Sequence, residues 1–220
     1  ADSVIAEEKA VISSFKATDH ILLNIGATKT IGEFVLRDIV NKFLSKDTNS
    51  LNLVIDNTEN LLKMLENSEL DFAVVEGVFD KKRYLYHLFK KESFAGICSK
   101  NHPFAGRCVT LKELFQESLI IRERGSGTRA LLEQAITERG FSFDCFKRTI
   151  SAGNFNVITD LVIRQNAITF AYIPIAKSRK DLAVFEVDDM KINGEFNFVY
   201  CSQKVADDKI TLFMDGNFEV

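Results

Sequence analysis

The chain has 220 residues, 46% of them hydrophobic and 27% charged, which is the composition of a globular protein with one large domain or two small lobes. Its 28 basic and 31 acidic residues give a formal net charge of −3, which argues against gripping a nucleic-acid backbone by bulk charge. No apolar run is long enough for a membrane span and no signal peptide is visible, so we expect a cytoplasmic protein without membrane contact.

The first predicted element is a helix over residues 4–16. Val4, Val11 and Phe15 recur at spacings of seven and four, which places them on one stripe. Such a stripe suits a helix that packs against a partner helix, and it equally suits a helix that caps its own domain. The pattern leaves both readings open.

The next elements alternate between strand and helix. Apolar strands are predicted at 21–25, 51–55 and 71–75, and helical patterns at 31–43 and 61–65. Strand, polar turn and helix in this order indicate right-handed parallel crossovers, and therefore a sheet covered on both faces.

A second α/β cycle begins near residue 93. Thr110 and Glu113 form a capping box that opens a short helix, and a longer helix is predicted from Thr128 to Arg139. No low-complexity linker separates the two cycles, so we expect two similar lobes joined by strands. The strands of this part are predicted at 94–98, 119–121, 168–173, 182–187 and 196–201, and another strand ends at Ile150.

Polar turns follow four of the strands, each just before a helix. In open α/β sheets this edge binds ligands, because helix N-termini present unpaired amides and a partial positive charge. Plain helix capping explains any single turn better, but four turns together favour a site for a small anion. The turns are Thr28-Lys29-Thr30, Asn57-Thr58, Gly125-Ser126-Gly127-Thr128 and Gly153-Asn154.

Three arginines flank the glycine turn. Arg122, Arg124 and Arg129 could add charge-assisted contacts to an anion, or could pair locally with Glu123 and Glu133 on a solvated surface.

Catalytic patterns are weak. Gly125-x-Gly127-x-x-Ala130 fits a loose dinucleotide fingerprint, but the next strand lacks the acidic residue that holds the ribose. Ser126 does not stand in a nucleophile elbow, and the histidines have no metal-binding spacing. We therefore expect no enzyme, no cofactor and no metal site. Four dispersed cysteines are expected to be reduced and mostly buried: Cys98, Cys108, Cys145 and Cys201.

Several of these stretches resemble the effector-binding domain of LysR-type transcriptional regulators, in family order and spacing over residues 19 to 201. The octet RERGSGTR is similar to the R-E-x-G-S-G-T-R of one large branch, which includes regulators of sulfur assimilation and of carbon-fixation operons. The stretches are residues 25–34 (IGATKTIGEF), 57–58 (NT), 71–77 (DFAVVEG), 102–105 (HPFA) and 122–129 (RERGSGTR).

The resemblance implies a two-lobed, type 2 periplasmic-binding-protein-like α/β fold. Each lobe would hold a mixed, mainly parallel sheet flanked by helices, and two strands would cross between the lobes. Residues 19–98 plus 196–220 would form lobe I and residues 99–195 lobe II. Residues 1–18 would be the tail of a linker or dimerisation helix, preceded by an N-terminal winged helix-turn-helix that is absent from this chain.

The resemblance also implies a non-catalytic function. The chain would be the effector-sensing domain of a bacterial transcription regulator that binds a small anionic metabolite between its lobes. Binding would alter the geometry of a homodimer or tetramer, and DNA would be contacted only through the missing N-terminal domain. The alternative is an extracytoplasmic solute-binding protein of the same fold.

The family's cleft residues carry over to individual positions here. Lys29 stands where relatives often have Ser or Thr, and the added cation favours an anionic effector. The family's usual Pro is replaced by Arg37, which we expect to change only the packing. Its usual G-L-G-I is replaced by Asn166-Ala167-Ile168-Thr169, so the effector of a relative is not carried over to this chain. The expected effector-binding residues are Thr28, Lys29, Thr30, Asn57, Glu76, Arg122, Ser126, Gly127, Thr128, Asn154 and Tyr172.

Overall fold

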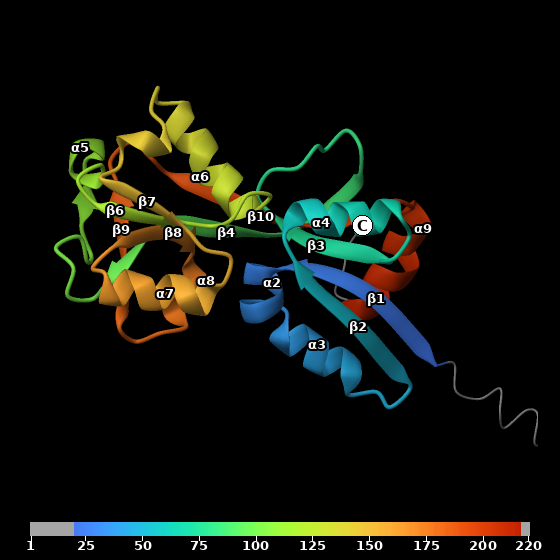
Figure 1. Ribbon diagram of the computed structural model, residues 1–220. Coiled ribbons are helices and arrows are strands. Elements are labelled where there is room, and N and C mark those ends of the chain that lie inside the picture. The colour runs from blue at the N-terminus through green and yellow to red at the C-terminus, as the bar shows by residue number, and fades with distance from the viewer. Residues whose placement is uncertain (1–19, 217–220) are drawn as a thin grey trace, which may run out of the picture.

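Two long strands, β4 (Leu85–Ser99) and β10 (Ile192–Tyr200), run side by side through the middle of the molecule and join its two halves (Figure 1). The computed structural model describes residues 20–216. The helix predicted within residues 1–18 therefore lies outside the described residues. The antiparallel pairing of β4 with β10 makes one continuous sheet of both halves, in the order β2-β1-β3-β10-β4-β8-β6-β7.

The first lobe is built on three parallel strands, with β1 between β2 and β3. Phe72 and Val74 of β3 face the cluster that includes Phe43 and Phe213, whereas Ala73 and Val75 face the helix α4. Helices accordingly cover both faces of this sheet (Figure 1). The elements are β1 (Ile21–Thr28), α2 (Lys29–Phe34), α3 (Arg37–Leu44), β2 (Asn49–Asp56), α4 (Thr58–Glu66), β3 (Phe72–Glu76), α9 (Gln203–Val205), the π-turn η2 (Ala206–Ile210) and α10 (Thr211–Phe213).

The second lobe repeats this plan around β6, which lies parallel to both β7 and β8. Leu119 and Ile121 of β6 join the cluster that contains Leu132 of α6, and Ile120 faces Phe155 of α7. Helices α6 and α7 consequently lie on opposite faces (Figure 1). The elements are β5 (Cys108–Val109), α5 (Leu111–Leu114), β6 (Ser118–Ile121), α6 (Gly127–Thr137), the 3-10 turn η1 (Phe143–Cys145), β7 (Arg148–Ser151), α7 (Phe155–Arg164), β8 (Ile168–Tyr172), α8 (Ile173–Lys177) and β9 (Leu182–Val187).

This architecture is the two-lobed α/β fold with mixed, mainly parallel sheets that the sequence predicts. Parallel pairs dominate within each lobe, and the antiparallel pairs involve β4 and β10. The residue boundaries given above for the lobes stay predictions, because the two crossing strands belong to both halves.

The structure corrects three local predictions. The single helix expected over 31–43 is two helices, because Val35 and Leu36 both donate to the carbonyl of Ile31 and the chain turns there. The strand expected at 94–98 is the second part of β4, which begins at Leu85. The cysteines are free, but only Cys98 is buried, so the expectation of mostly buried thiols is wrong.

Candidate functional site

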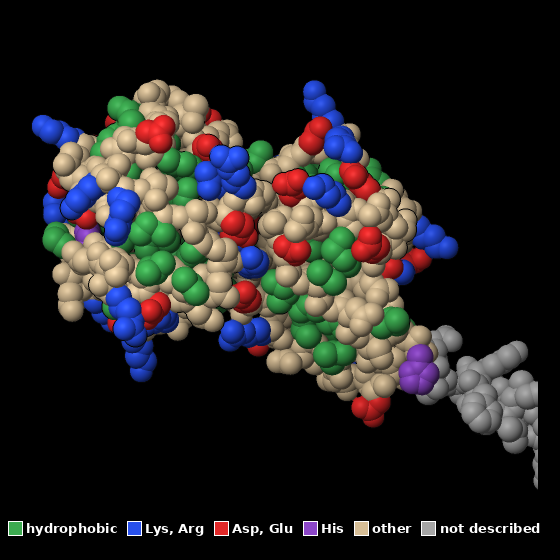
Figure 2. Space-filling model, viewed as in Figure 1, with side chains coloured by type: hydrophobic (Ala, Val, Ile, Leu, Met, Phe, Trp, Pro, Cys, Tyr) green, Lys and Arg blue, Asp and Glu red, His purple; other side chains and the backbone are tan. Residues whose placement is uncertain are grey.

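The predicted site residues lie at the boundary between the lobes, where several strands end and helices begin. Thr28 ends β1, Glu76 ends β3 and Tyr172 ends β8, while Arg122 directly follows β6. Acidic and basic side chains alternate along this boundary on the surface (Figure 2). The boundary is therefore polar, although hydrophobic clusters fill the interior of both lobes.

Glu76 is the centre of the site. Its carboxylate oxygen Oε1 accepts hydrogen bonds from the hydroxyls of Thr30, at 2.8 Å, and Thr128, at 2.6 Å. Thr30 belongs to the first lobe and Thr128 to the second, so one carboxylate oxygen links the lobes. The other oxygen, Oε2, is fully buried and has no hydrogen-bond partner among residues 20–216.

The environment of Glu76 opposes its negative charge. Burial raises the pKa of this carboxyl, and the hydrogen bonds from Thr128 and Thr30 and the charge of Arg122 only partly offset the effect. The nearby carboxylate of Glu123 raises the pKa further. Glu76 thus holds a proton more readily than an exposed glutamate does.

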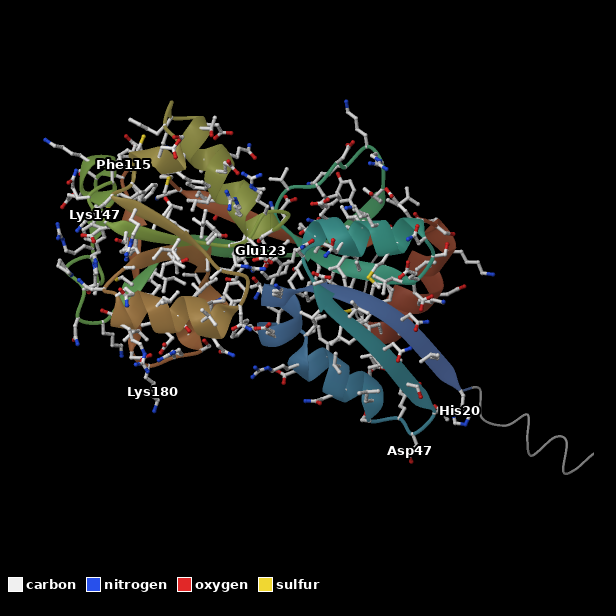
Figure 3. The ribbon with its side chains drawn as sticks, viewed as in Figure 1. His20, Asp47, Phe115, Glu123, Lys147 and Lys180 are labelled. Atoms are coloured by element: carbon white, nitrogen blue, oxygen red, sulfur yellow. The ribbon has the colours of Figure 1, made fainter. Side chains whose placement is uncertain are left out.

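A second link between the lobes is made by Lys29 at the start of α2. Its ammonium donates to Glu123 Oε1, at 3.0 Å, and to the carbonyl of Gly153, at 2.7 Å. Glu123 lies between the two lobes, close to α2 (Figure 3). Both side chains of the pair are about a quarter exposed, so water screens the interaction only in part.

Arg122 completes this charged group. Its Nε and Nη2 atoms donate to the two oxygens of Glu123, at 2.8 and 3.0 Å, and its guanidinium lies 4.5 Å from the ring centroid of Phe155. Burial would raise the pKa of Glu123, but Arg122 and Lys29 together hold it below its usual value. The remaining nitrogen of Arg122, Nη1, is buried without a partner in the described part of the chain.

Tyr172 and Thr28 add two buried hydroxyls. Both side chains are almost fully buried, and neither hydroxyl has a well-formed hydrogen bond to another described residue. The backbone amide of Gly77 acts to lower the pKa of Tyr172, and the charge of Glu76 acts more strongly in the opposite direction. Burial, with a smaller contribution from Glu76, raises the pKa of Tyr172.

Two glycines allow the backbones of the lobes to touch. A Cβ atom on Gly127 would lie 2.1 Å from the carbonyl oxygen of Glu76, and one on Gly77 would lie 2.4 Å from that of Gly127. Gly77 also has φ +79°, which favours glycine. Gly127 therefore serves the close approach of the lobes, a role that its place in the sequence motif did not reveal.

Asn57 and Asn154, two of the remaining predicted residues, cap helices. Asn57 Oδ1 accepts from the amide of Asn60, at 2.9 Å, at the start of α4. Asn154 Oδ1 accepts from Asn156, at 2.9 Å, and from the next residue, at the start of α7. The side-chain oxygens of both residues are thus engaged in capping, which is the plain alternative that the sequence analysis gives for these turns. Ser126 stands at the start of α6, where its side chain makes no capping hydrogen bond.

A groove of about 430 Å³ opens beside the start of α6 and takes its lining from both lobes. Arg124 at its edge is exposed, and none of the ion pairs of residues 20–216 includes it. The lining residues are Thr58, Glu59, Leu62, Val78, Phe79, Arg124, Gly125, Ser126, Gly127, Arg129, Ala130 and Glu133.

Glu123 is the site residue that the sequence reasoning missed. The sequence pattern indicates Glu123 only as a local partner of the arginines, and that pairing is present for Arg122. Its contact with Lys29 joins residues 94 apart in the chain, and no local pattern signals such a contact.

Two further features are absent from the part of the chain that the structure describes. No group of three or more His, Cys, Asp or Glu side chains in residues 20–216 could hold a metal ion. Within the same range, no helix has the length and apolar character that crossing a membrane requires.

Two α/β lobes, two crossing strands and polar helix starts facing a shared boundary define a two-lobed ligand-binding domain of the type 2 periplasmic-binding-protein-like class. Residues 18–216 match the family described as LysR substrate binding domain. The chain belongs to this family.

Curated relatives are transcriptional regulators. The HTH-type regulator MJ0300 of Methanocaldococcus jannaschii is 25% identical over 186 residues, which cover 84% of this chain and 62% of that protein. CysL of Bacillus subtilis is 28% identical over 175 residues, which cover 78% of this chain and 56% of that protein. The RuBisCO operon transcriptional regulator of Allochromatium vinosum is 28% identical over 138 residues, which cover 62% of this chain and 45% of that protein. The chain thus spans about half the length of these relatives.

Solved structures share the fold. The regulatory domain of Synechocystis CcmR, solved in complex with 2-PG, has a TM-score of 0.75 at 19% identity and covers 89% of this chain and 97% of its own. The effector-binding domain of QuiR, solved with shikimate, has a TM-score of 0.73 at 17% identity, and the match covers 90% of this chain and 97% of that domain.

These matches confirm the family that the sequence motifs indicate and the predicted fold. The relatives are regulators rather than enzymes, in agreement with the weak catalytic patterns, and the solute-binding alternative is not favoured.

Proposed function

We propose that this chain is the effector-sensing domain of a LysR-type transcription regulator, and that its effector is a small anion bound between the lobes. The observation that carries the proposal is the meeting of Thr30, Glu76 and Thr128, which joins hydroxyls of both lobes at one buried point. A ligand at this point touches both lobes and can change how they pack.

The charges around this point support an anionic effector. Lys29 and Arg122 lie at the boundary, and the first-turn amides of α6 have no partner within their own helix. Glu123 already neutralises part of this positive charge, so an effector would share the cations with it. Two structural neighbours bind 2-PG and shikimate, which supports a small metabolite as the ligand.

The regulatory step follows from differential binding. An effector shifts the arrangement of the lobes only if it binds one arrangement more tightly than the other. We infer that this shift changes the geometry of a homodimer or tetramer and, through it, the contact with DNA. In the full protein, DNA binding would belong to a winged helix-turn-helix outside this chain, acting in the cytoplasm.

Titration calorimetry tests the proposal with sulfate, phosphate, thiosulfate and small carboxylates as probes. Thr128→Val removes the hydroxyl from the second lobe and should weaken the binding of any probe by at least about tenfold, equivalent to about 1.4 kcal/mol. Thr137→Val, an exposed position at the end of the same helix, is the matched control and should leave binding unchanged. Absence of binding by every probe would refute the anionic effector.

A further inference from the structure

Glu76 and Arg122 place two unsatisfied charged atoms in the same boundary. Glu76 is 1% exposed and Arg122 is 4% exposed, so both side chains are withdrawn from water. The unpartnered atoms are Oε2 of the carboxylate and Nη1 of the guanidinium, as judged over residues 20–216. Arg122 is close enough to Glu76 for its charge to lower the pKa of that carboxyl.

The two atoms require opposite partners. A carboxylate oxygen only accepts hydrogen bonds, whereas a guanidinium nitrogen only donates them. Buried polar atoms in folded proteins are nearly always hydrogen-bonded, and a buried charge is more demanding than a neutral group. A ligand that satisfies both atoms must therefore offer one donor as well as one acceptor.

Simple anions differ in this respect. Sulfate near neutral pH has only acceptor oxygens, so it can bind Arg122 but meets Oε2 of Glu76 with like charge and no shared proton. Monohydrogen phosphate and hydroxycarboxylates combine negative oxygens with an O–H group. We propose that the effector is an oxyanion that carries its own hydroxyl, donated to Oε2 of Glu76 while its negative oxygen accepts from Nη1 of Arg122. This inference rests on the proposed function and specifies the chemical class of the effector.

The geometry of Glu76 gives the carboxylate this selective role. Its Oε1 is held by the hydroxyls of Thr30 and Thr128, and both hydroxyls donate to it. The carboxyl group is thereby fixed, so Oε2 cannot turn away from a bound ligand without breaking a link between the lobes.

An anion without a hydroxyl, such as sulfate, can form a hydrogen bond with Oε2 of Glu76 only if Glu76 itself carries the proton. Burial raises the pKa of this carboxyl, while Arg122, Glu123 and Tyr172 are the titratable groups that interact with it. Sulfate would then bind together with one proton taken from solution, and its affinity would fall about tenfold per pH unit above the pKa of Glu76. A ligand that carries its own hydroxyl needs no such uptake.

The experiment compares two pairs of probes on the whole chain by titration calorimetry. Sulfate and phosphate are both tetrahedral, and acetate and glycolate are carboxylates that differ by one hydroxyl. At about pH 8, phosphate should bind at least about tenfold more tightly than sulfate, and glycolate at least about tenfold more tightly than acetate. Repeating the titrations in two buffers of different ionisation enthalpy should show proton uptake with sulfate and acetate only.

Glu76→Gln removes the negative charge of the carboxylate and keeps the shape of the side chain. Its amide nitrogen can donate where Oε2 only accepts, so the preference for phosphate over sulfate should fall at least about fivefold. Glu138→Gln, an exposed position beyond the end of α6, is the control and should keep the wild-type preference. Circular dichroism of each variant verifies the fold. If Glu76→Gln does not fold, the titrations of the wild type with the two pairs of probes test the proposal by themselves.

The outcomes are distinct. Equal affinity for both members of each pair at about pH 8, without proton uptake, overturns the requirement for a hydroxyl and leaves the anion-sensing function in place. An unchanged phosphate preference in folded Glu76→Gln also overturns it. No binding of any of the four probes overturns this inference, and the anionic effector falls with it only if thiosulfate and the other small carboxylates also fail to bind.

Discussion

Thr128, at the start of α6 in the second lobe, donates a 2.6 Å hydrogen bond to the carboxylate of Glu76 at the end of β3 in the first lobe. Thr30 donates to the same oxygen from the first lobe. The two hydroxyls expected to hold an effector are thus engaged by a carboxylate of the chain itself. An incoming anion must share this place with Glu76 or take its hydroxyl partners.

Removing the Thr128 hydroxyl should weaken the contact between the lobes. Thr128→Val keeps the shape of the side chain but leaves Oε1 of Glu76 with one donor, which should lower the free energy of unfolding by about 1–3 kcal/mol. Urea unfolding measures this change. Thr137→Val on the same helix should differ from the wild type by less than about 0.5 kcal/mol. Equal stability of the two variants would contradict the prediction.

The stability of the chain should depend on pH through Glu76. Burial raises the pKa of Glu76 above 4.5, so the folded chain binds this proton more tightly than the unfolded chain does. The contribution of this carboxyl to the free energy of unfolding is therefore largest below about pH 4.5 and declines as the pH rises towards the folded-state pKa. Gln does not titrate, so Glu76→Gln should gain stability relative to the wild type as the pH rises from about 4.5 towards the folded-state pKa of Glu76.

Urea unfolding at several pH values checks this trend, with Glu138→Gln as the control for loss of one carboxyl group. A difference between Glu76→Gln and the wild type that stays constant with pH, or changes in the opposite direction, would rule out a raised pKa at Glu76.

The sequence predicts the strand ends well because buried strands and polar caps are local signals. Thr30, Glu76 and Thr128 each stand beside such an end, and the fold brings all three together. The contacts themselves join residues 46 and 52 apart in the chain, so periodicity and capping rules do not reach them. That these residues bind the effector stays a prediction.

The elements that the sequence described poorly lack a clear pattern. The first part of β4 exposes Leu85, Tyr86 and Leu88, and side chains on both of its faces reach solvent, so no alternation of period two marks the strand. The break between α2 and α3 leaves the four-residue spacing of Ile31, Val35 and later apolar residues intact. Hydrophobic spacing therefore could not show it.

Lys29 should contribute more to stability than an exposed lysine in a similar pair. Lys29→Met removes a partly buried link to Glu123 and to the carbonyl of Gly153, and should lower the free energy of unfolding by about 0.5–1 kcal/mol. Lys63 pairs with Glu59 on the surface of α4, where both side chains are mostly exposed. Lys63→Met should therefore change the free energy of unfolding by less than about 0.5 kcal/mol. Urea unfolding decides, and a larger effect at Lys63 would contradict the ranking.

The cysteines should differ in reactivity. Cys98 is buried in β4, and burial raises its pKa to about 11, so its reactive thiolate is scarce near neutral pH. Native chain treated with iodoacetamide should gain label at the three exposed cysteines, and at Cys98 only after unfolding. Mass spectrometry of the digested protein locates the label. Early modification of Cys98 would show that this strand opens in the folded state. The exposed residues are Cys108, Cys145 and Cys201.

Gly127 should tolerate no side chain, although alanine is normally the better residue in a helix. A Cβ atom there would lie 2.1 Å from the carbonyl oxygen of Glu76, a backbone atom that moves only if the lobes separate. Gly127→Ala should therefore lower the free energy of unfolding by about 1–3 kcal/mol in urea. Gly153→Ala is the control, because its Cβ would meet only movable side-chain ends, those of Glu123 at 3.3 Å and Lys29 at 3.6 Å. If Gly127→Ala instead stabilises the chain, the close approach of the lobes at this point is wrong.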